Sequence, residues 1–285
     1  LLLHLIVFIW GWTGIFGKAI DLPAIQLVWL RLPIALIGIF GFMIYKKISL
    51  RATKMELLKI CSVGLIVTIH WVAFYAAIKE INVSVTLACF SAGSLFTAFI
   101  EPIFFKRKIL WYELLFGAMV IGALLLIFNV ESNYKTGIVL GILAALTSSI
   151  FGVLNGVMVK QGIDSAKIAL YEMLGGFVGL TIYVVCVGIF SPHWLVISTQ
   201  NWIYMLVFGL VCTTLPFLIG MYILKEISPY TVSLTLNLET IYGIIFAFFI
   251  FHEHEQMTTG FFIGTLIILS TIFVNGILKK YLNNK

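Results

Sequence analysis

Residues 137–159 read GIVLGILAALTSSIFGVLNGVMV, an apolar run that contains no charged side chain. A helix needs about 20 apolar residues to cross the hydrocarbon core of a bilayer, and this run is long enough. Its apolar residues do not alternate with polar ones, as they would in a strand of an outer-membrane barrel. The run therefore predicts a transmembrane helix. Nine further blocks of the same kind lie at residues 1–17, 25–45, 57–78, 83–105, 110–128, 168–190, 202–224, 230–251 and 258–278.

The composition favours an all-α integral membrane protein with ten transmembrane helices. Of the 285 residues, 61% are apolar and 11% are charged, whereas an ordinary soluble domain carries about 25% charged residues. A soluble globule needs a polar boundary and a disordered chain needs high charge, so both classes are excluded. The four cysteines lie within or beside apolar runs and form no CxxC pair, so they predict neither a disulfide nor a metal site. We expect residues 1–17 to be the first span rather than a signal peptide, because no small-residue cleavage site follows them.

Lysine and arginine are distributed unequally between the two sets of loops. With the N-terminus inside, fourteen of these residues lie on the inner side, and three, Lys18, Lys79 and Lys135, lie on the outer side. Cytoplasmic loops retain positive charge, so the bias predicts a multi-pass protein of the cell (inner) membrane with both termini cytoplasmic. The net charge of +6 then belongs to these loops, and we expect no nucleic acid partner.

The two halves of the chain share a weak repeat. The dipeptides at 10–11 (WG) and 151–152 (FG) lie 141 residues apart, and KEI tripeptides at 79–81 and 225–227 close the third and the eighth predicted spans. Each half then holds five spans, and an odd number of spans places the second half upside down relative to the first. We therefore predict two inverted five-helix repeats, at residues 1–130 and 137–280.

Three short motifs lie in the first, second and ninth predicted spans: WG at 10–11 followed by Lys18, WLRL at 29–32 followed by Ala35, and LNLE at 236–239 followed fourteen residues later by Glu253. In these motifs the chain resembles the drug/metabolite transporter superfamily, and in particular its EamA-type families. Thr240 departs from the pattern, because the family usually has Pro after the LNLE motif. The resemblance implies a ten-span transporter of amino acids, sugars, nucleotide precursors or drugs, often directed outward.

Two ionisable side chains occupy equivalent positions in the predicted halves, Arg31 in the second span and Glu172 in the seventh. Ionisable groups within spans are costly and usually face a cavity or a partner. The functional interpretation is a zwitterion site, in which Arg31 binds a carboxylate and Glu172 binds an ammonium group. The structural alternative is that each side chain pairs with a neighbouring helix. Glu101 lies near the inner surface, where we expect a gate or anchor contact.

Further polar candidates lie deep in the third and ninth spans. Glu239 is the deepest carboxylate and is a candidate to carry a coupling proton or to attract a cationic group. The structural alternative is hydrogen bonding to Asn237 or to backbone groups freed at a distorted helix. His70 lies beside aromatic residues that suit an amphipathic solute, and the alternative is a buried, satisfied histidine. The predicted substrate-binding set is Trp10, Arg31, His70, Trp71, Phe74, Tyr75, Ser91, Asn155, Glu172, Asn237 and Glu239, with Thr13 and Ser94 as further candidates.

Motifs of other function classes are missing from the sequence. No G-x-x-x-x-G-K-[ST] loop occurs, so we expect neither ATP-driven transport by this chain nor a bound cofactor. Residues 252–256 (HEHEQ) lack the second His of a metal-binding H-E-x-x-H motif, and we expect them to form a solvated, mildly pH-sensitive turn outside the membrane.

The function predicted from these observations is a secondary transporter that exports small organic metabolites, such as amino acids or related amphipathic solutes, by alternating access. The alternative is an intramembrane enzyme acting on a lipid-linked substrate, which the scatter of single charges at different depths disfavours. The expected partners are the lipid bilayer and a small-molecule solute, with protons as a candidate coupling ion. GxxxG pairs indicate tight packing within the bundle, and we expect a monomer or a weak homodimer.

Overall fold

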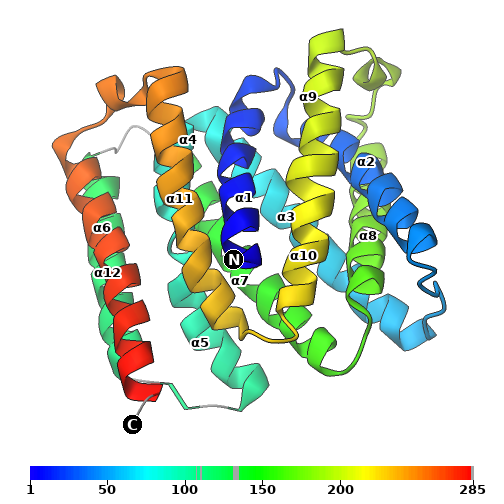
Figure 1. Cartoon of the computed structure of the whole chain (residues 1–285). Helices are drawn as coiled ribbons and strands as arrows, with labels where there is room; N and C mark the ends of the chain where they lie inside the picture. Colours follow the sequence, from blue (N-terminus) through cyan, green and yellow to red (C-terminus); the bar gives the residue numbers. More distant parts are fainter. Residues whose placement is uncertain (107, 110, 131–134, 284–285) are drawn as a thin grey trace.

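The computed structural model describes residues 1–106, 108–109, 111–130 and 135–283, which contain helices and no strand. Arg107 and Lys285, two of the predicted inner-side cations, and Leu110, at which the fifth predicted span begins, lie outside the described residues. The first half contains α1 (Leu2–Ala19), α2 (Ala24–Tyr45), α3 (Lys54–Glu80), α4 (Val83–Phe90), α5 (Gly93–Phe105) and α6 (Trp111–Val130). The second half contains α7 (Lys135–Lys160), α8 (Ser165–Cys186), α9 (Thr199–Gly209), a π-helical turn (Leu210–Thr214), α10 (Leu215–Ile223), α11 (Pro229–Phe251) and α12 (Thr259–Asn283) (Figure 1).

Eight helical segments among the described residues are long and apolar enough to cross a membrane. They are Leu2–Ala19, Ala24–Tyr45, Lys54–Glu80, Val83–Phe105, Lys135–Lys160, Ser165–Cys186, Thr199–Ile223 and Pro229–Phe251. Thr259–Thr271, within α12, is a shorter apolar helix, and α12 packs against α6 at one edge of the bundle (Figure 1). The prediction of an all-α, multi-pass membrane protein is confirmed, while the count of ten spans and the inversion of the halves stay predictions.

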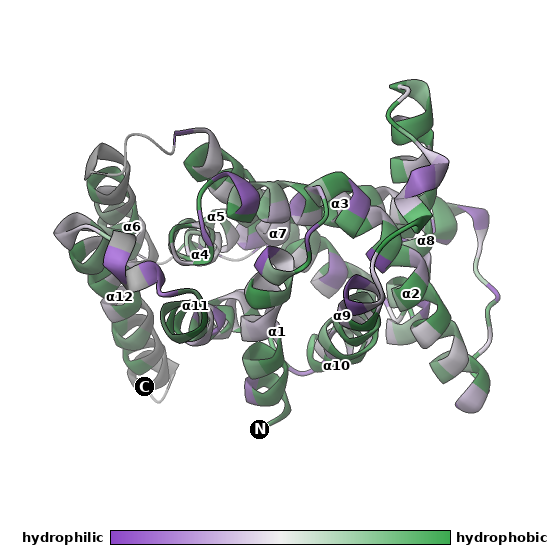
Figure 2. Ribbon diagram, turned by 90° about the horizontal axis from the view of Figure 1, so that it is seen from above, coloured by the Kyte–Doolittle hydropathy of each residue, from purple (hydrophilic) through white to green (hydrophobic). Residues whose placement is uncertain are grey.

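The outer surface of the bundle is apolar. Viewed from above, α6 and α12 lie at one edge, α2 and α8 at the other, and α1, α3, α7, α10 and α11 between them, with apolar residues along most of their length (Figure 2). Large apolar side chains such as Ile37, Phe249 and Leu266 are more than half exposed. A soluble protein rarely exposes so much contiguous apolar surface, so these side chains are suited to contact lipid.

Close packing of α3 against α8 depends on glycines. A Cβ at Gly64 would overlap the backbone carbonyl of Glu172, and a Cβ at Gly175 would overlap the backbone of Cys61. Small residues allow helix backbones to approach one another in a membrane, where lipid offers no hydrophobic drive to pack. The approach places the backbone of Glu172 directly against α3.

The fourth predicted span, residues 83–105, is divided into α4 and α5. At the division, Ser91 Oγ donates a hydrogen bond to the Ala88 carbonyl at 2.6 Å. Ser149 Oγ, from α7, donates to the Gly93 carbonyl at 2.7 Å. Backbone groups at membrane depth need protein partners because no water is available, and these hydroxyls supply them.

The eighth predicted span, residues 202–224, also departs from a regular helix. Pro216 has no backbone N–H, and its ring excludes the carbonyl one turn earlier, so the chain widens into the π-helical turn Leu210–Thr214. The Thr213 Oγ1 hydroxyl donates to the Phe208 carbonyl at 2.7 Å, and the Thr214 Oγ1 hydroxyl donates to the Gly209 carbonyl at 3.0 Å. The widened turn is thereby satisfied by its own side chains.

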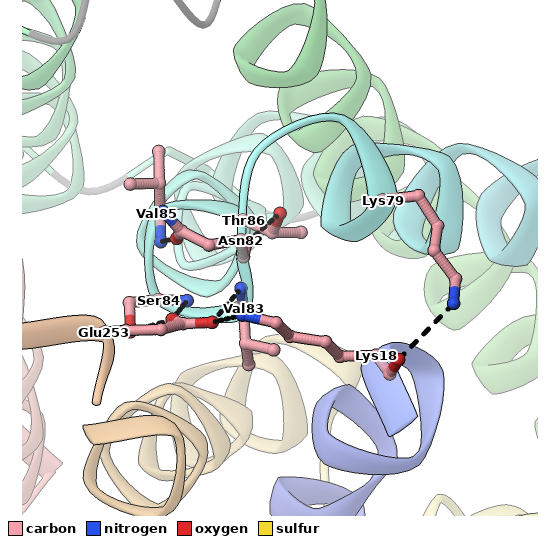
Figure 3. Close-up of polar contacts among 8 residues, drawn as sticks. All are labelled: Lys18, Lys79, Asn82, Val83, Ser84, Val85, Thr86 and Glu253. Carbon is pink, nitrogen blue, oxygen red and sulfur yellow. Dashed lines mark hydrogen bonds and ion pairs between the residues drawn. The ribbon is translucent and has the colours of Figure 1, made fainter. Parts of the chain in front are cut away.

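The N-terminus of α4 is held by Glu253, which follows α11 (Figure 3). Glu253 Oε1 accepts from Lys18 Nζ at 2.8 Å and from the Val83 N–H at 3.1 Å. Glu253 Oε2 accepts from the Ser84 N–H at 2.8 Å and from Ser84 Oγ at 2.6 Å. We call these four residues, Glu253, Lys18, Val83 and Ser84, the α4 cap. The expectation of a solvated turn is wrong for Glu253, which is 0% exposed, because the unpaired N–H groups at a helix start bind its carboxylate.

A second carboxylate holds the opposite end of α11. Glu101, near the end of α5, is buried and accepts a hydrogen bond from the Tyr230 N–H at 3.1 Å, in the first turn of α11. This contact agrees with the anchor role expected for Glu101. Each of the two segments, Val83–Phe105 and α11, therefore begins on an acid supplied from the far end of the other.

Candidate functional site

A cavity of about 990 Å³, counting its opening to solvent, lies in the middle of the bundle. It is lined by α1, α2, α3, α4, α5, α7, the π-helical turn, α10 and α11. Its walls are mostly apolar, with a few polar groups that converge on the same space, as is usual for small-molecule sites. Eight residues of the predicted set line it: Trp10, Arg31, His70, Trp71, Phe74, Tyr75, Asn155 and Glu239. Thr13 lines it as well, whereas Ser91, Ser94, Glu172 and Asn237 are not among the lining residues.

Arg31 is 2% exposed and is held in place by neutral partners. Its Nε donates to Thr213 Oγ1 at 2.6 Å and its Nη1 donates to the Tyr75 hydroxyl at 2.7 Å. The guanidinium carbon lies 4.0 Å from the ring centre of Trp71 and 4.2 Å from that of Phe208. No carboxylate in the described part of the chain forms an ion pair with Arg31. A guanidinium has five N–H donors, so several stay available to an anionic group in the cavity.

Glu239, on α11, faces the same cavity and is 6% exposed. Arg31 lines the same space. No hydrogen bond joins Glu239 to Asn237 or to another side chain within the described ranges. Residues two apart on a helix point to different sides, which is why the predicted alternative of a Glu239–Asn237 bond is not formed. The Glu239 carboxylate is therefore open to a cationic group or a proton in the cavity.

His70 lies within a cluster of aromatic rings. Phe74, Phe90 and Phe151 have ring centres 6.0, 5.5 and 5.4 Å from the imidazole. His70 Nδ1 lies 2.8 Å from the Ala144 carbonyl, which can only accept, so Nδ1 carries the hydrogen. His70 is thus a buried histidine with a hydrogen bond through Nδ1, as in the structural alternative. It is also part of the cavity wall, as in the functional interpretation.

The predicted pairing of Arg31 with Glu172 in one zwitterion site is not what the geometry provides. Arg31 lines the cavity, whereas Glu172 is 0% exposed and lies behind the wall, bonded to the lining residue Asn155. The cavity still brings a guanidinium and a carboxyl group to one space, because Glu239 lines it together with Arg31.

The comparisons with known proteins give the family of the chain. The model of the EamA-like transporter family matches residues 1–129 and again residues 135–277. The chain belongs to the EamA-like transporter family. It falls within the drug/metabolite transporter superfamily that the motifs resemble.

Two relatives extend this comparison. An uncharacterized transporter of Bacillus subtilis (strain 168), YoaV, is 22% identical to the chain over 280 residues, which cover 95% of this chain and 94% of YoaV. One solved crystal structure matches with a TM-score of 0.72 at 10% sequence identity, covering 97% of this chain and 96% of that one. At that identity the likeness shows a common fold.

Several residues of this family member line the cavity without having been predicted. Thr213 orients Arg31, and the hydroxyl of Thr97 on α5 donates to Ser233 Oγ on α11 at 3.1 Å. Thr213 precedes Pro216 in a threonine pair, and this pattern is a signal for a distorted helix with free carbonyls. Thr97 and Ser233 carry no such signal, since isolated hydroxyls are common in transmembrane helices.

Proposed function

We propose that this protein is a secondary transporter, not an enzyme, that exports small organic metabolites such as amino acids or related amphipathic solutes. In this proposal it resides in the cell membrane as ten spans in two inverted halves, with both termini cytoplasmic. The family, the apolar outer surface and the match of one family model to both halves support the proposal.

The observation that carries the proposal is the chemistry of the cavity wall. A guanidinium without an acidic partner, Arg31, and a carboxylate without a hydrogen-bond donor among the described residues, Glu239, face one space. Trp71, Phe74 and Phe151 supply apolar wall between and beside them. Such a wall suits a solute that has a carboxylate, an ammonium group and an apolar body.

The two ends of the cavity support alternating access. Its lining extends to Leu224 and Pro229, which flank the connection between α10 and α11 on the predicted cytoplasmic side. At the other end of α11 the α4 cap joins Glu253 to the start of α4 and to the end of α1. We infer that this arrangement is the inward-directed state, and that export requires the α4 cap to separate while the inner end closes.

The proposal is tested by transport in proteoliposomes that contain the purified protein. A panel of radiolabelled amino acids, sugars and amines is presented under a solute gradient, with and without a pH gradient. We expect Arg31→Lys to lower uptake of the transported solute about tenfold, as for the loss of a charge-assisted hydrogen bond. Arg51→Lys, at an exposed position outside the cavity, is the matched control and should transport normally. A wild-type protein that moves no member of the panel under either gradient would refute the transporter proposal.

A further inference from the structure

Glu172 and Asn155 share an unusual set of unpaired atoms. Asn155 Nδ2 donates to Glu172 Oε2 at 3.4 Å, which joins α7 to α8. The remaining oxygens of the pair, Glu172 Oε1 and Asn155 Oδ1, are both buried and have no hydrogen-bond partner. Both side chains are at most 1% exposed, so these orphaned acceptors cannot be satisfied by bulk water.

We propose that Glu172 is a proton-binding site, in which the carboxylic acid and the Asn155 amide form a hydrogen-bonded pair, and that a solute in the cavity controls release of this proton through Asn155. The second part of the proposal rests on the transport function proposed above. The first part, that Glu172 binds a proton, concerns the protein alone and can be tested without any transported solute.

One proton completes the hydrogen bonding of the pair. A neutral carboxyl group carries one O–H donor, while an ionised one only accepts. A hydrogen on Glu172 Oε1 supplies the donor that Asn155 Oδ1 lacks, and the amide already donates to Oε2. At 3.4 Å that amide contact is long, so it leaves the carboxyl group weakly satisfied.

Within the part of the chain that the structure describes, no cation forms an ion pair with Glu172. The elements packed against α8 are α2, α3, α7 and α10, and their ionisable groups have other partners or lie at the helix ends. Arg31 bonds to Tyr75 and Thr213, and His70 bonds to the Ala144 carbonyl. The other nearby groups are engaged elsewhere too: Cys61 with the Tyr171 carbonyl, Lys160 with the Phe105 ring, Lys167 with the Arg51 carbonyl and Tyr222 with Lys225.

A proton fits this site better than a metal ion. Hard cations such as Ca²⁺ and Mg²⁺ take six or more oxygen ligands, and this pair has only two unpaired oxygens. In the described part of the chain no group of three His, Cys, Asp or Glu side chains is arranged to hold a metal. An isolated ionised carboxylate in such surroundings normally neutralises itself by taking up a proton.

Asn155 connects this proton to the cavity. It is a lining residue, whereas Glu172 lies behind it, so a solute that hydrogen-bonds to Asn155 competes directly with the acid–amide pair. When the pair opens and water from the cavity reaches Glu172, the proton passes from Oε1 to that water, which also hydrates the carboxylate that is left. When the solute departs, a proton from water returns to Oε1 and the pair closes again.

Infrared difference spectroscopy of the full-length protein in lipid tests the proton site without any solute. The C=O stretch of a protonated carboxylic acid is recorded while the pH is changed. We expect a band that is lost in Glu172→Gln, retained in Glu239→Gln, and shifted in Asn155→Leu, which removes the amide partner but keeps the branched outline of the side chain. Thermal melting of each variant shows that it is folded. A spectrum that keeps every protonated-carboxyl band in Glu172→Gln overturns the proposal.

The link to transport is tested separately in proteoliposomes with L-phenylalanine as the probe. The ratio of uptake with and without a pH gradient is measured, and we expect it to exceed unity in the wild type and to fall to unity in Glu172→Gln. A ratio that exceeds unity in both proteins, or that equals unity in the wild type, overturns the link. If the wild type takes up no L-phenylalanine, the link is overturned, the transport proposal is decided by the full solute panel, and the infrared result still decides whether Glu172 binds a proton.

Discussion

Two carboxylates of this protein are completely buried in contrasting surroundings. Glu253, in the α4 cap, accepts four hydrogen bonds, one of them from Lys18 (Figure 3). Glu172, in the middle part of α8, has one long hydrogen bond from Asn155 and an oxygen with no partner. Both side chains are 0% exposed, so burial alone does not distinguish them.

The difference lies in what each carboxylate needs from its surroundings. Glu253 has a cation and the N–H groups of a helix start, which stabilise its ionised form and tie three helices together. Among the described residues no cation and no backbone N–H group binds Glu172, so a proton on the acid itself supplies the donor that its surroundings lack. A buried carboxylate whose oxygens all have hydrogen-bond donors is thus suited to fix helices in place. A buried carboxylate that lacks donors and lies beside a cavity is suited to bind and release a proton.

The largest effect on stability is expected for Glu253→Ala. This substitution leaves the Val83 and Ser84 N–H groups and the Lys18 cation without their partner. Removing one member of a buried charged network costs about 3–5 kcal/mol. Unfolding of the purified protein in mixed detergent measures this loss. Glu255→Ala, at an exposed position of the same turn, is the control, and equal stability of the two variants would contradict the role of the α4 cap.

A smaller loss, of about 3 kcal/mol, is expected for Gly64→Ala, since the new methyl group would overlap the Glu172 carbonyl and force α3 from α8. The same unfolding measurement applies. Gly41→Ala is the matched control, because a Cβ at Gly41 meets nothing within 4 Å and should be neutral or slightly stabilising. A Gly64→Ala protein as stable as the control would show that the helices do not approach so closely.

Lys18→Met should destabilise the protein by about 1–2 kcal/mol, because Glu253 keeps its bonds to Val83 and Ser84 but loses its cation. Lys18 is partly exposed, which limits the loss. Lys135→Met, at an exposed position at the start of α7, serves as the control in the same assay. A loss as large as that of Glu253→Ala would mean that the ion pair, rather than the helix start, dominates the α4 cap.

The smallest effect on stability is expected for Glu172→Gln, under about 1 kcal/mol, because glutamine has the shape and neutrality of the protonated acid. The same change at Glu253 should cost more, since an amide cannot replace a carboxylate that faces Lys18 and two backbone N–H groups. The two glutamine variants are compared side by side by thermal unfolding. Equal melting temperatures would remove the distinction between the two acids.

Much of the fold could be predicted from hydrophobic runs alone. Each spanning helix places its side chains in lipid or in the protein interior, so it must be apolar along most of its length. The run at 137–159 lies within α7, and the run at 57–78 lies within α3. The division at Ser91 and the widened turn at Thr213 could not be predicted in the same way. They depend on hydroxyl groups that meet carbonyls, partly from another helix, and hydropathy does not record such contacts.

The residues of the site that were predicted best are ionisable ones, which are rare within apolar spans. A buried arginine and a deep carboxylate in apolar spans indicate a cavity, and Arg31 and Glu239 both line one. Glu172 and Asn237 have the same rarity but lie outside the lining, because the rotation of a helix about its axis is fixed by packing and not by composition. The partners of Glu253 at the start of α4 could not be predicted, because they include backbone groups of residues about 170 positions away.

The reciprocal anchoring of α4 and α11 makes neither half of the molecule self-sufficient. Glu101 belongs to residues 1–129 but serves a helix in residues 135–277, and Glu253 does the reverse. If the first half were expressed alone, the start of α4 would lack Glu253, and in the second half alone the start of α11 would lack Glu101. Two separately produced halves should therefore fold only when they meet, so that assembly of the complete bundle is a single cooperative event.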